Sequence, residues 1–201
     1  KYPRKKKNMK GIFLDIESNG LDPRRHEVIE IAFVIRHLKS GETLETFETL
    51  AHIDKELWKL SDTESLKVNG FTYDQLKNAP NTASIGEEIH KIFTRQRIVR
   101  GQAFFICQNP SFDRAFFSKL VPIYQQEKYN WPYHWLDLAS MYWGKTSDTY
   151  LQSPGKEPLL NLSKNFIAKQ LGLPPESSPH KALNGVEHLI ACYEKLIGFK
   201  K

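Results

Sequence analysis

The chain has few cysteines and no long apolar run. Its two cysteines, Cys107 and Cys192, stand far apart in apolar surroundings, without the close spacing of a zinc site. We therefore expect them to be reduced core residues of an intracellular protein. No stretch is apolar enough to span a membrane, and the charged N-terminus does not read as a signal peptide. The sequence thus predicts a soluble, cytoplasmic protein with no membrane partner.

Internal repeats and low-complexity segments are also absent from the body of the chain, which excludes solenoid architectures. With 201 residues, 40% of them hydrophobic and 12% aromatic, the chain can bury one substantial core and is short for two. We expect a single domain over residues 10–201. Basic residues crowd residues 1–9, and such a run is typically a disordered arm. Because Met9 could open the reading frame, it stays open whether residues 1–8 belong to the native protein.

Acidic residues are outnumbered by basic ones. The chain has 23 aspartates and glutamates against 29 lysines and arginines, which gives a formal net charge of +6. This excess favours an anionic partner such as nucleic acid, without identifying one.

Two acids interrupt an apolar strand near the N-terminus. Residues 11–20 read GIFLDIESNG, so Asp15 and Glu17 are two positions apart and lie on one face of the strand. Carboxylates this close raise each other's pKa unless a cation lies between them, and hard divalent cations prefer such oxygen ligands. The alternative is an edge strand whose acids are both solvated.

Hydrophobic periodicity predicts a mixed α/β fold. Beyond the first strand, we expect strands at residues 28–35, 43–53 and 98–107, helices at 83–93, 159–171 and 182–196, and a surface loop at 146–158. A further helix is expected after Ser111, which would be its N-cap. Residues 135–138 are expected to form a short strand or to start a helix, with Asp137 as a cap. The aromatic residues within 129–143 indicate core and loop packing or, alternatively, an interface or base-stacking surface.

A third acid follows the strand at residues 98–107. The run NPSFD at residues 109–113 begins a helix there and puts Asp113 in its first turn. In open α/β sheets, binding sites lie at the carboxyl ends of the strands. The alternative is that Asp113 only complements the helix dipole.

These motifs together resemble those of the DnaQ-like, DEDDh-type 3′-to-5′ exonucleases, which include the epsilon subunit of bacterial DNA polymerase III and oligoribonuclease. FLDIESNGL at residues 13–21 is similar to the family's first motif and NPSFD to its second. VNGFT at residues 68–72 resembles the linking segment, and HKAL at residues 180–183 resembles the start of the third motif. The resemblance implies an α/β, ribonuclease H-like fold: a central mixed five-stranded sheet, three antiparallel strands first, flanked by helices.

The resemblance also implies a chemistry. Two Mg²⁺ or Mn²⁺ ions would be held by Asp15, Glu17 and Asp113, and His180 would be the general base for the attacking water. The partner would be nucleic acid with a free 3′ end, single-stranded or frayed, with DNA favoured, and a polymerase is a further candidate partner. Residues expected by analogy to bind the substrate are Ser18, Asn19, Gly20, Leu21, Asn109 and Phe112.

The third motif departs from the family at one position. Where the family has its fourth metal-binding aspartate, five residues after the histidine, this chain has Gly185. Glu187 is the nearest acid along the helix, but two residues turn it by about 200°. We therefore expect a water in the missing ligand's place, a weakened metal site and slower turnover.

Two classes of function stay open. The first is an exonuclease with a depleted metal site, and the second is a catalytically inactive DnaQ-like module that binds nucleic-acid ends or a polymerase. A third interpretation, with structural acids and another phosphate ligand, leaves the ordered motifs unexplained.

Overall fold

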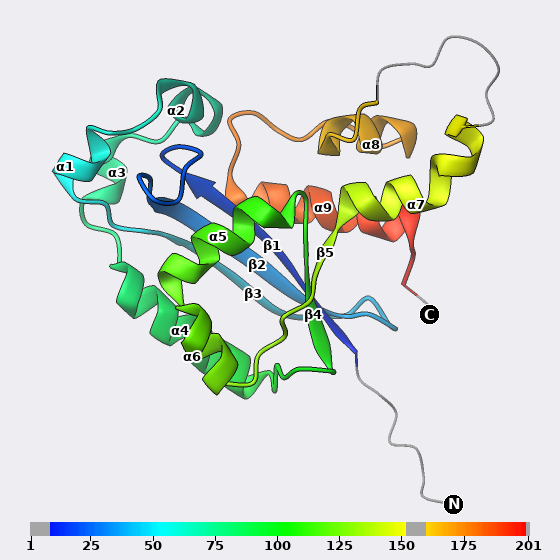
Figure 1. The fold of residues 1–201 in the computed structure, drawn as a ribbon, viewed down its shortest axis with the longest axis horizontal. Coiled ribbons are helices and arrows are strands. Elements are labelled where there is room, and N and C mark those ends of the chain that lie inside the picture. The colour runs from blue at the N-terminus through cyan, green and yellow to red at the C-terminus, as the bar shows by residue number, and fades with distance from the viewer. Residues whose placement is uncertain (1–8, 152–159, 200–201) are drawn as a thin grey trace, which may run out of the picture.

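A five-stranded mixed sheet forms the centre of the computed structural model, which describes residues 9–151 and 160–199 (Figure 1). The strands are β1 (Lys10–Ser18), β2 (Val28–His37), β3 (Thr43–Leu50), β4 (Ala103–Cys107) and β5 (Trp135–Asp137), in the order β3-β2-β1-β4-β5. The pairs β1–β2 and β2–β3 are antiparallel, whereas β1–β4 and β4–β5 are parallel. The predicted ribonuclease H-like sheet, with three antiparallel strands first, is confirmed.

Helices cover both faces of this sheet. They are α1 (Lys55–Trp58), α2 (Thr63–Asn69), α3 (Tyr73–Leu76), α4 (Thr82–Arg95), α5 (Pro110–Leu120), α6 (Ile123–Lys128), α7 (Leu138–Leu151), α8 (Lys164–Gln170) and α9 (Ala182–Leu196). Ile12, Leu14 and Ile16 of β1 belong to the core shared with α4 and α5, while Phe13 belongs to the core shared with α9. Asp15 and Glu17 alternate with the first set and therefore belong to the α9 side.

The position of β1 decides between the two interpretations of its acids. The strand is hydrogen-bonded to β2 on one side and to β4 on the other, so it is central. The alternative of a solvated edge strand is wrong, because Asp15 keeps only 18% of its side chain exposed.

The aromatic residues near β5 mostly serve packing. Trp131 is 3% exposed in the core, and Trp135 stacks on Phe105 with ring centroids 4.0 Å apart. Tyr133 stays half-exposed, with the Arg100 guanidinium 4.5 Å from its ring centroid. For these two tryptophans, the prediction that the aromatic residues serve core and loop packing is therefore confirmed.

Several element boundaries differ from the expectations. The third strand ends at Leu50, and β4 begins only at Ala103, because Arg97 and Gly101 adopt left-handed backbone angles (φ 50° and 78°) that interrupt an extended run. The expected helix at 159–171 is shorter, as α8, and begins after Ser163, whose hydroxyl accepts the N–H of Phe166.

The predicted loop at residues 146–158 is wrong in its first part, because α7 continues to Leu151. Tertiary contacts override the polar composition here: Lys145 Nζ donates to the Leu196 carbonyl at the end of α9, 2.8 Å away, and Thr146 bonds back to the Tyr142 carbonyl. Residues 152–158 of that loop, and residues 1–8 of the predicted arm, lie outside the described residues.

No helix in the described ranges is long and apolar enough to cross a membrane. Cys107 and Cys192 are both buried and free, as expected for core thiols.

We predict that Gly86→Ala destabilises the packing of α4 on α5. A Cβ at Gly86 would overlap the backbone carbonyl oxygen of Leu120, which cannot move without shifting α5. Forced overpacking of this kind costs about 1–3 kcal/mol, so the thermal midpoint should fall by several degrees. Calorimetry checks this, with Gly144→Ala in α7 as the matched control, because a Cβ there meets nothing within 4 Å. Equal midpoints for the two variants would contradict the prediction.

Candidate active site

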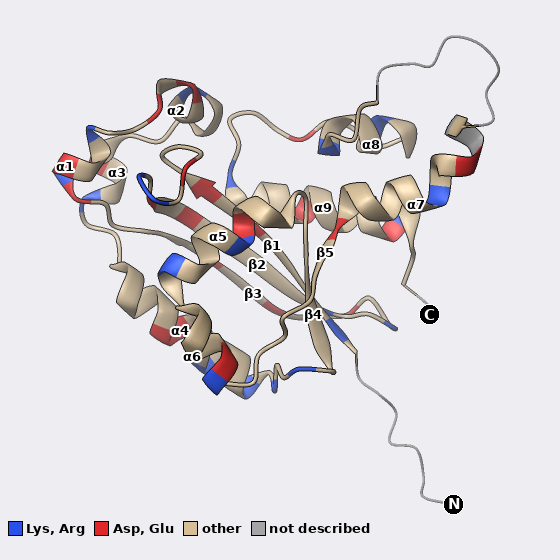
Figure 2. Ribbon diagram, in the orientation of Figure 1, with Lys and Arg blue, Asp and Glu red and all other residues tan. Residues whose placement is uncertain are grey.

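Sequence-distant acids meet in a cleft at the carboxyl end of β1. The cleft has a volume of about 350 Å³ and is lined by β1, the start of α5, the start of α8 and the segment before α9. Six of the predicted site residues line it: Asp15, Glu17, Asn109, Phe112, Asp113 and His180. Figure 2 marks acidic positions on β1 and in the first turn of α5. The parallel pairing of β1 with β4 explains this convergence, because it brings both carboxyl ends to one edge of the sheet.

Asp113 is fixed by a bond to the strand that carries the other two acids. Its side chain is 2% exposed, and its Oδ1 accepts the backbone N–H of Ile16 at 3.2 Å. Ile16 lies between Asp15 and Glu17, so this bond sets the first turn of α5 against the paired acids. Asp113 therefore does more than complement a helix dipole.

Asn109, and not the predicted Ser111, is the N-cap of α5. It adopts a left-handed conformation (φ 59°) that turns the chain from β4 into the helix, and Pro110 follows at the first helical position. The Asn109 N–H donates to Asp137 Oδ1 at 3.1 Å, and Asp137 also accepts the N–H of Ser140. Asp137 thus caps α7, as predicted for that residue.

The turn after β1 places Leu21 at the surface and Ser18 inside. Ser18 Oγ donates to the Gly20 carbonyl at 2.6 Å, which closes the turn on itself. A Cβ at Gly20 would overlap the buried His26 ring, so only glycine allows this approach. Leu21 is 72% exposed, directly after this rigid turn.

Asn19, a predicted substrate residue, has a fully buried side chain. Its amide donates to the Leu57 carbonyl and to Ser61, and its Oδ1 accepts the N–H of Glu27 at 2.6 Å. The side chain therefore anchors the turn to α1 and to the start of β2, and does not reach the surface.

His180 is held by the segment that links the motifs. Its N–H donates to the Val68 carbonyl at 3.0 Å, and Lys181 Nζ donates to the Asn69 carbonyl. The N–H of Ala182, which begins α9, donates to a buried Glu30 carboxylate oxygen at 2.7 Å. The backbone on both sides of His180 is thereby fixed to α2 and β2, which explains its place in the cleft.

The site holds several buried acids, and Lys164 is the one basic side chain, among the residues that the structure describes, that lowers their pKa values. Burial, followed by the charge of Asp15, raises the pKa of Glu17 to about 8. Burial also raises the pKa of Asp15 to about 6 and the pKa of Asp113 well above its usual range, although the charge of Lys164 lowers both. The charged forms of these carboxyl groups therefore require a cation beside them.

Two charged residues that line the cleft were not predicted from the sequence: Lys164 and Glu176. Lys164 Nζ lies 3.9 Å from Asp15 Oδ1 and forms an ion pair with Glu176 at 3.0 Å. Their side chains are 11% and 4% exposed. Where we expected a water beside Gly185, the structure thus brings a carboxylate and an ammonium group. The sequence pointed to this carboxylate only through the position of Glu176, an acid four residues before His180 that belongs to no motif.

The donor set fits a hard divalent cation in its chemistry. The carboxylates are all-oxygen ligands with raised pKa values, and the buried Gln108 Oε1 in the same cleft finds no hydrogen-bond partner among the described residues. As they lie, however, no group of three or more histidine, cysteine, aspartate or glutamate side chains in the described part of the chain is arranged to hold a metal ion. Binding one would require Lys164 and the carboxylates to reorient.

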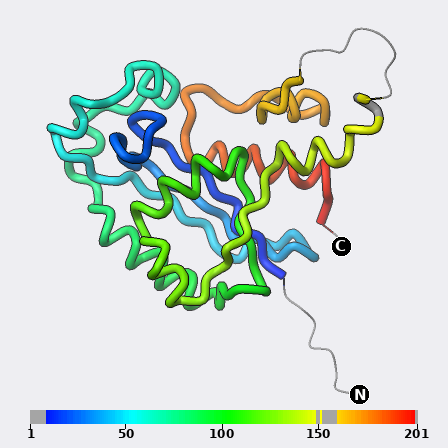
Figure 3. Tube along the Cα trace, in the orientation of Figure 1, coloured from blue at the N-terminus to red at the C-terminus, as the bar shows by residue number. Residues whose placement is uncertain are grey.

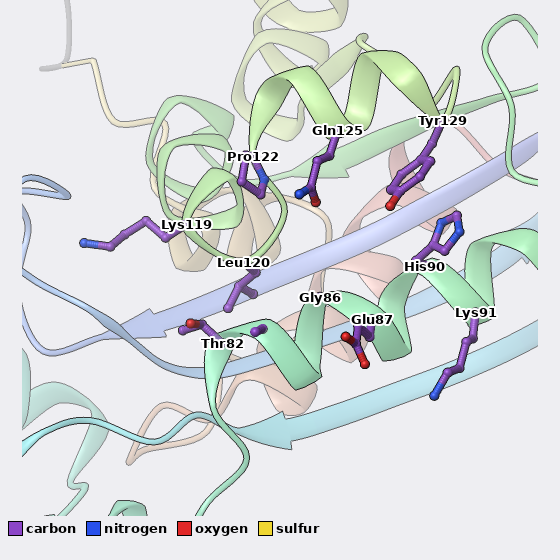
Figure 4. Close-up of a pocket in the computed structure, with 11 residues that line it drawn as sticks. Thr82, Gly86, Glu87, His90, Lys91, Lys119, Leu120, Pro122, Gln125 and Tyr129 are labelled. Carbon is purple, nitrogen blue, oxygen red and sulfur yellow. The ribbon is translucent and has the colours of Figure 1, made fainter.

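A second, larger hollow of about 530 Å³ lies between α4 and the α5–α6 pair (Figure 4). The His90 ring stacks on Tyr129 there, with ring centroids 3.9 Å apart, and Lys119 and Glu87 also line it. Lys119 is already bonded to Glu27 and to two backbone carbonyls. Since none of the predicted site residues reaches this hollow, we assign the site to the β1 cleft.

We predict that the chelated protein loses stability as the pH rises. The folded state holds a proton on Glu17 up to about pH 8, whereas the ordinary pKa is 4.5, so stability falls between these values and does not recover above them. At about 1.4 kcal/mol per pKa unit, the difference between a pKa of 4.5 and one of about 8 corresponds to a fall in stability on the order of 5 kcal/mol. Urea unfolding in EDTA at about pH 5 and about pH 9 measures it.

Glu17→Gln should make this pH dependence shallower without abolishing it, because the amide does not titrate whereas Asp15 and Asp113, whose pKa values are also raised by burial, still do. Glu56→Gln on exposed α1 is the control and should keep the native slope. If the unfolding free energy of Glu17→Gln falls with pH as steeply as that of the native chain, the assignment of this pH dependence to Glu17 is refuted.

Comparisons with known proteins identify the family of this chain. Residues 12–193 match the sequence profile of a family described as "Exonuclease". The DNA polymerase III PolC-type of Staphylococcus haemolyticus is 31% identical over 105 residues, which is 52% of this chain and 6% of that protein. The corresponding Staphylococcus aureus protein is 30% identical over 105 residues, with the same coverage of 52% and 6%. The matched stretch thus spans a small fraction of these relatives.

Solved structures share the fold. Zinc-bound E. coli exonuclease I in complex with single-stranded DNA has a TM-score of 0.72 at 17% identity, covering 94% of this chain and 40% of that one. Cell-death related nuclease 4 has a TM-score of 0.73 at 14% identity, covering 96% of this chain and 66% of that one. Since the family match covers most of the chain and the fold agrees, the chain belongs to the DnaQ-like exonuclease family.

Proposed function

We propose that this chain is a metal-dependent 3′-to-5′ exonuclease that acts on single-stranded or frayed ends of nucleic acid, with DNA favoured. The observation that carries the proposal is the meeting of Asp15, Glu17, Asp113 and His180 in one cleft, although they come from three separate parts of the sequence. The family match and the net positive charge of +6 support it.

Each of these side chains has a task in phosphodiester hydrolysis. Asp15, Glu17 and Asp113 would hold Mg²⁺ or Mn²⁺, directly or through water, and the bound ions would neutralise the phosphate and the charge that develops on the attacking and leaving oxygens. His180, half-buried at the mouth of the cleft, would take the proton of the attacking water. Its backbone bond to Val68 fixes the main chain from which the side chain projects.

Selection of the 3′ end falls to the turn after β1. The backbone of residues 18–20 is rigid, and Leu21 projects from it as an exposed apolar side chain. Such a side chain can pack as an apolar wedge against the terminal base of a frayed strand. Asn109 and Phe112 line the cleft and would contact the same nucleotide.

A catalytically inactive binding module is the second candidate. Gly185 favours it, because the chain lacks the acid that the family carries at this position, and Lys164 lies among the remaining acids. The PolC-type relatives make a polymerase a candidate partner of either form. Two buried free cysteines suit a reducing cytoplasm in both cases.

We predict chelator-sensitive shortening of a 5′-labelled single-stranded oligonucleotide in Mg²⁺ or Mn²⁺. Asp113→Asn and His180→Asn should each slow it by about 100-fold or more, because each removes a group that acts on the reacting atoms. Asp74→Asn, an exposed acid of α3, is the control. A phosphorothioate at the last 3′ linkage should block degradation, whereas one at the 5′ end should not.

Retarded migration of the oligonucleotide without shortening would refute the exonuclease and support the binding module. Degradation blocked only by the 5′ phosphorothioate would refute the direction.

We also predict that Leu21→Ala lowers kcat/KM without lowering stability. Loss of a buried leucine contact is worth about 1.5–3 kcal/mol, so the rate on a duplex end should drop by about 10-fold or more. Leu60→Ala, at a 50% exposed position, is the control. Steady-state rates on duplex and single-stranded substrates measure the effect, and unchanged rates on both would exclude contact with the end.

A further inference from the structure

The space at Gly185 is filled by two carboxylates of the same chain. A Cβ at Gly185 would overlap Asp15 Oδ2 and would lie 3.0 Å from Glu176 Oε1. A helix position that carried an acid side chain could not coexist with this arrangement. The glycine therefore makes room for a carboxylate that arrives from elsewhere.

We propose that Glu176 is the fourth acid of the active site, supplied by the loop before α9, and that Lys164 is its exchangeable counter-ion. This inference rests on the proposed metal-dependent function and assigns to that site two residues that no motif contains. Glu176 would be a ligand of the divalent cation, directly or through water, and Lys164 would withdraw when the cation enters.

The side chain of Glu176 is buried, and its backbone is fixed by a hydrogen bond to α8. Its carboxylate is 4% exposed, and its backbone N–H donates to Asn165 Oδ1 of α8 at 2.8 Å. The segment between α8 and α9, orange in Figure 3, leads from this point to His180. The loop thus supplies both a carboxylate and a histidine to one cleft.

Lys164 occupies the position of a cation among oxygen atoms. Its Nζ lies 3.0 Å from Glu176 Oε1, 3.9 Å from Asp15 Oδ1 and 3.4 Å from the Gly185 carbonyl oxygen. Carboxylate and carbonyl oxygens are also the ligands that a hard divalent cation takes. The four-carbon stem of lysine is flexible, so the ammonium group can leave while α8 stays in place.

A purely structural ion pair predicts a different response once Lys164 is removed. If Glu176 only anchored Lys164, its removal would free the ammonium group to pair with Asp15 and could weaken metal binding only while Lys164 is present. If Glu176 is a ligand, its loss weakens metal binding whether or not Lys164 is present.

The test is Mn²⁺ binding by the full chain, measured by calorimetry and by the electron paramagnetic resonance of free Mn²⁺. Glu176→Gln should lower the affinity by about 10-fold or more, in the range found when groups that support a metal site are removed. Lys164→Met should raise the affinity, because no ammonium group competes, and should lower the thermal midpoint of the chelated protein. Glu187→Gln, an exposed acid on α9, is the matched control and should bind Mn²⁺ as the native chain does.

The double variant Lys164→Met/Glu176→Gln keeps the test decisive if Glu176→Gln alone fails to fold. Compared with Lys164→Met, it should bind Mn²⁺ about 10-fold more weakly. Equal affinities of these two variants, or an undiminished affinity in a folded Glu176→Gln, would overturn the inference. Asp15→Asn separates failure of the proposed metal site from failure of the role given to Glu176. If Asp15→Asn binds Mn²⁺ as the native chain does, the proposed metal site itself is refuted. If Asp15→Asn loses Mn²⁺ binding while Glu176→Gln keeps it, only the role of Glu176 is refuted.

Discussion

Carboxylates buried together at the end of a central strand need positive charge close by, and much of the surrounding fold meets that need. Asp15 pairs with Ala32 of β2 and keeps only 18% of its side chain exposed. Glu30 on β2 pairs directly opposite Glu17 and adds another buried acid. The first N–H of α9 donates a hydrogen bond to Glu30, and the ammonium group of Lys164 lies close to Asp15. The starts of α8 and α9 are thus placed where partial or full positive charge is required.

Much of the fold could be predicted from the sequence because its local and long-range signals agree. The apolar residues of β1 alternate between two cores, and the boundaries predicted for α9 match the structure. The convergence of Asp15 and Asp113 also followed from strand topology, since parallel neighbours present their carboxyl ends at one edge.

The remaining features depend on contacts between segments that the sequence does not pair. The cap of α5 is Asn109 and not Ser111, because the left-handed residue at the strand end moves the helix start two positions earlier. The last turns of α7 depend on the bond from Lys145 to the end of α9. Lys164 and Glu176 could not be identified, since neither belongs to a motif and their ion pair forms only when α8 and the following loop fold together.

The glycine at the family's usual acid position changes how such chains can be recognised. A pattern that counts five residues from the histidine to an acid would discard this sequence as inactive, although a carboxylate lies in the same volume. A carboxylate can reach the same volume from another part of the chain, since a loop of moderate length can deliver it from another direction. A pattern that accepts glycine after the histidine when an acid such as Glu176 precedes it would retain this chain and separate it from sequences that have lost both.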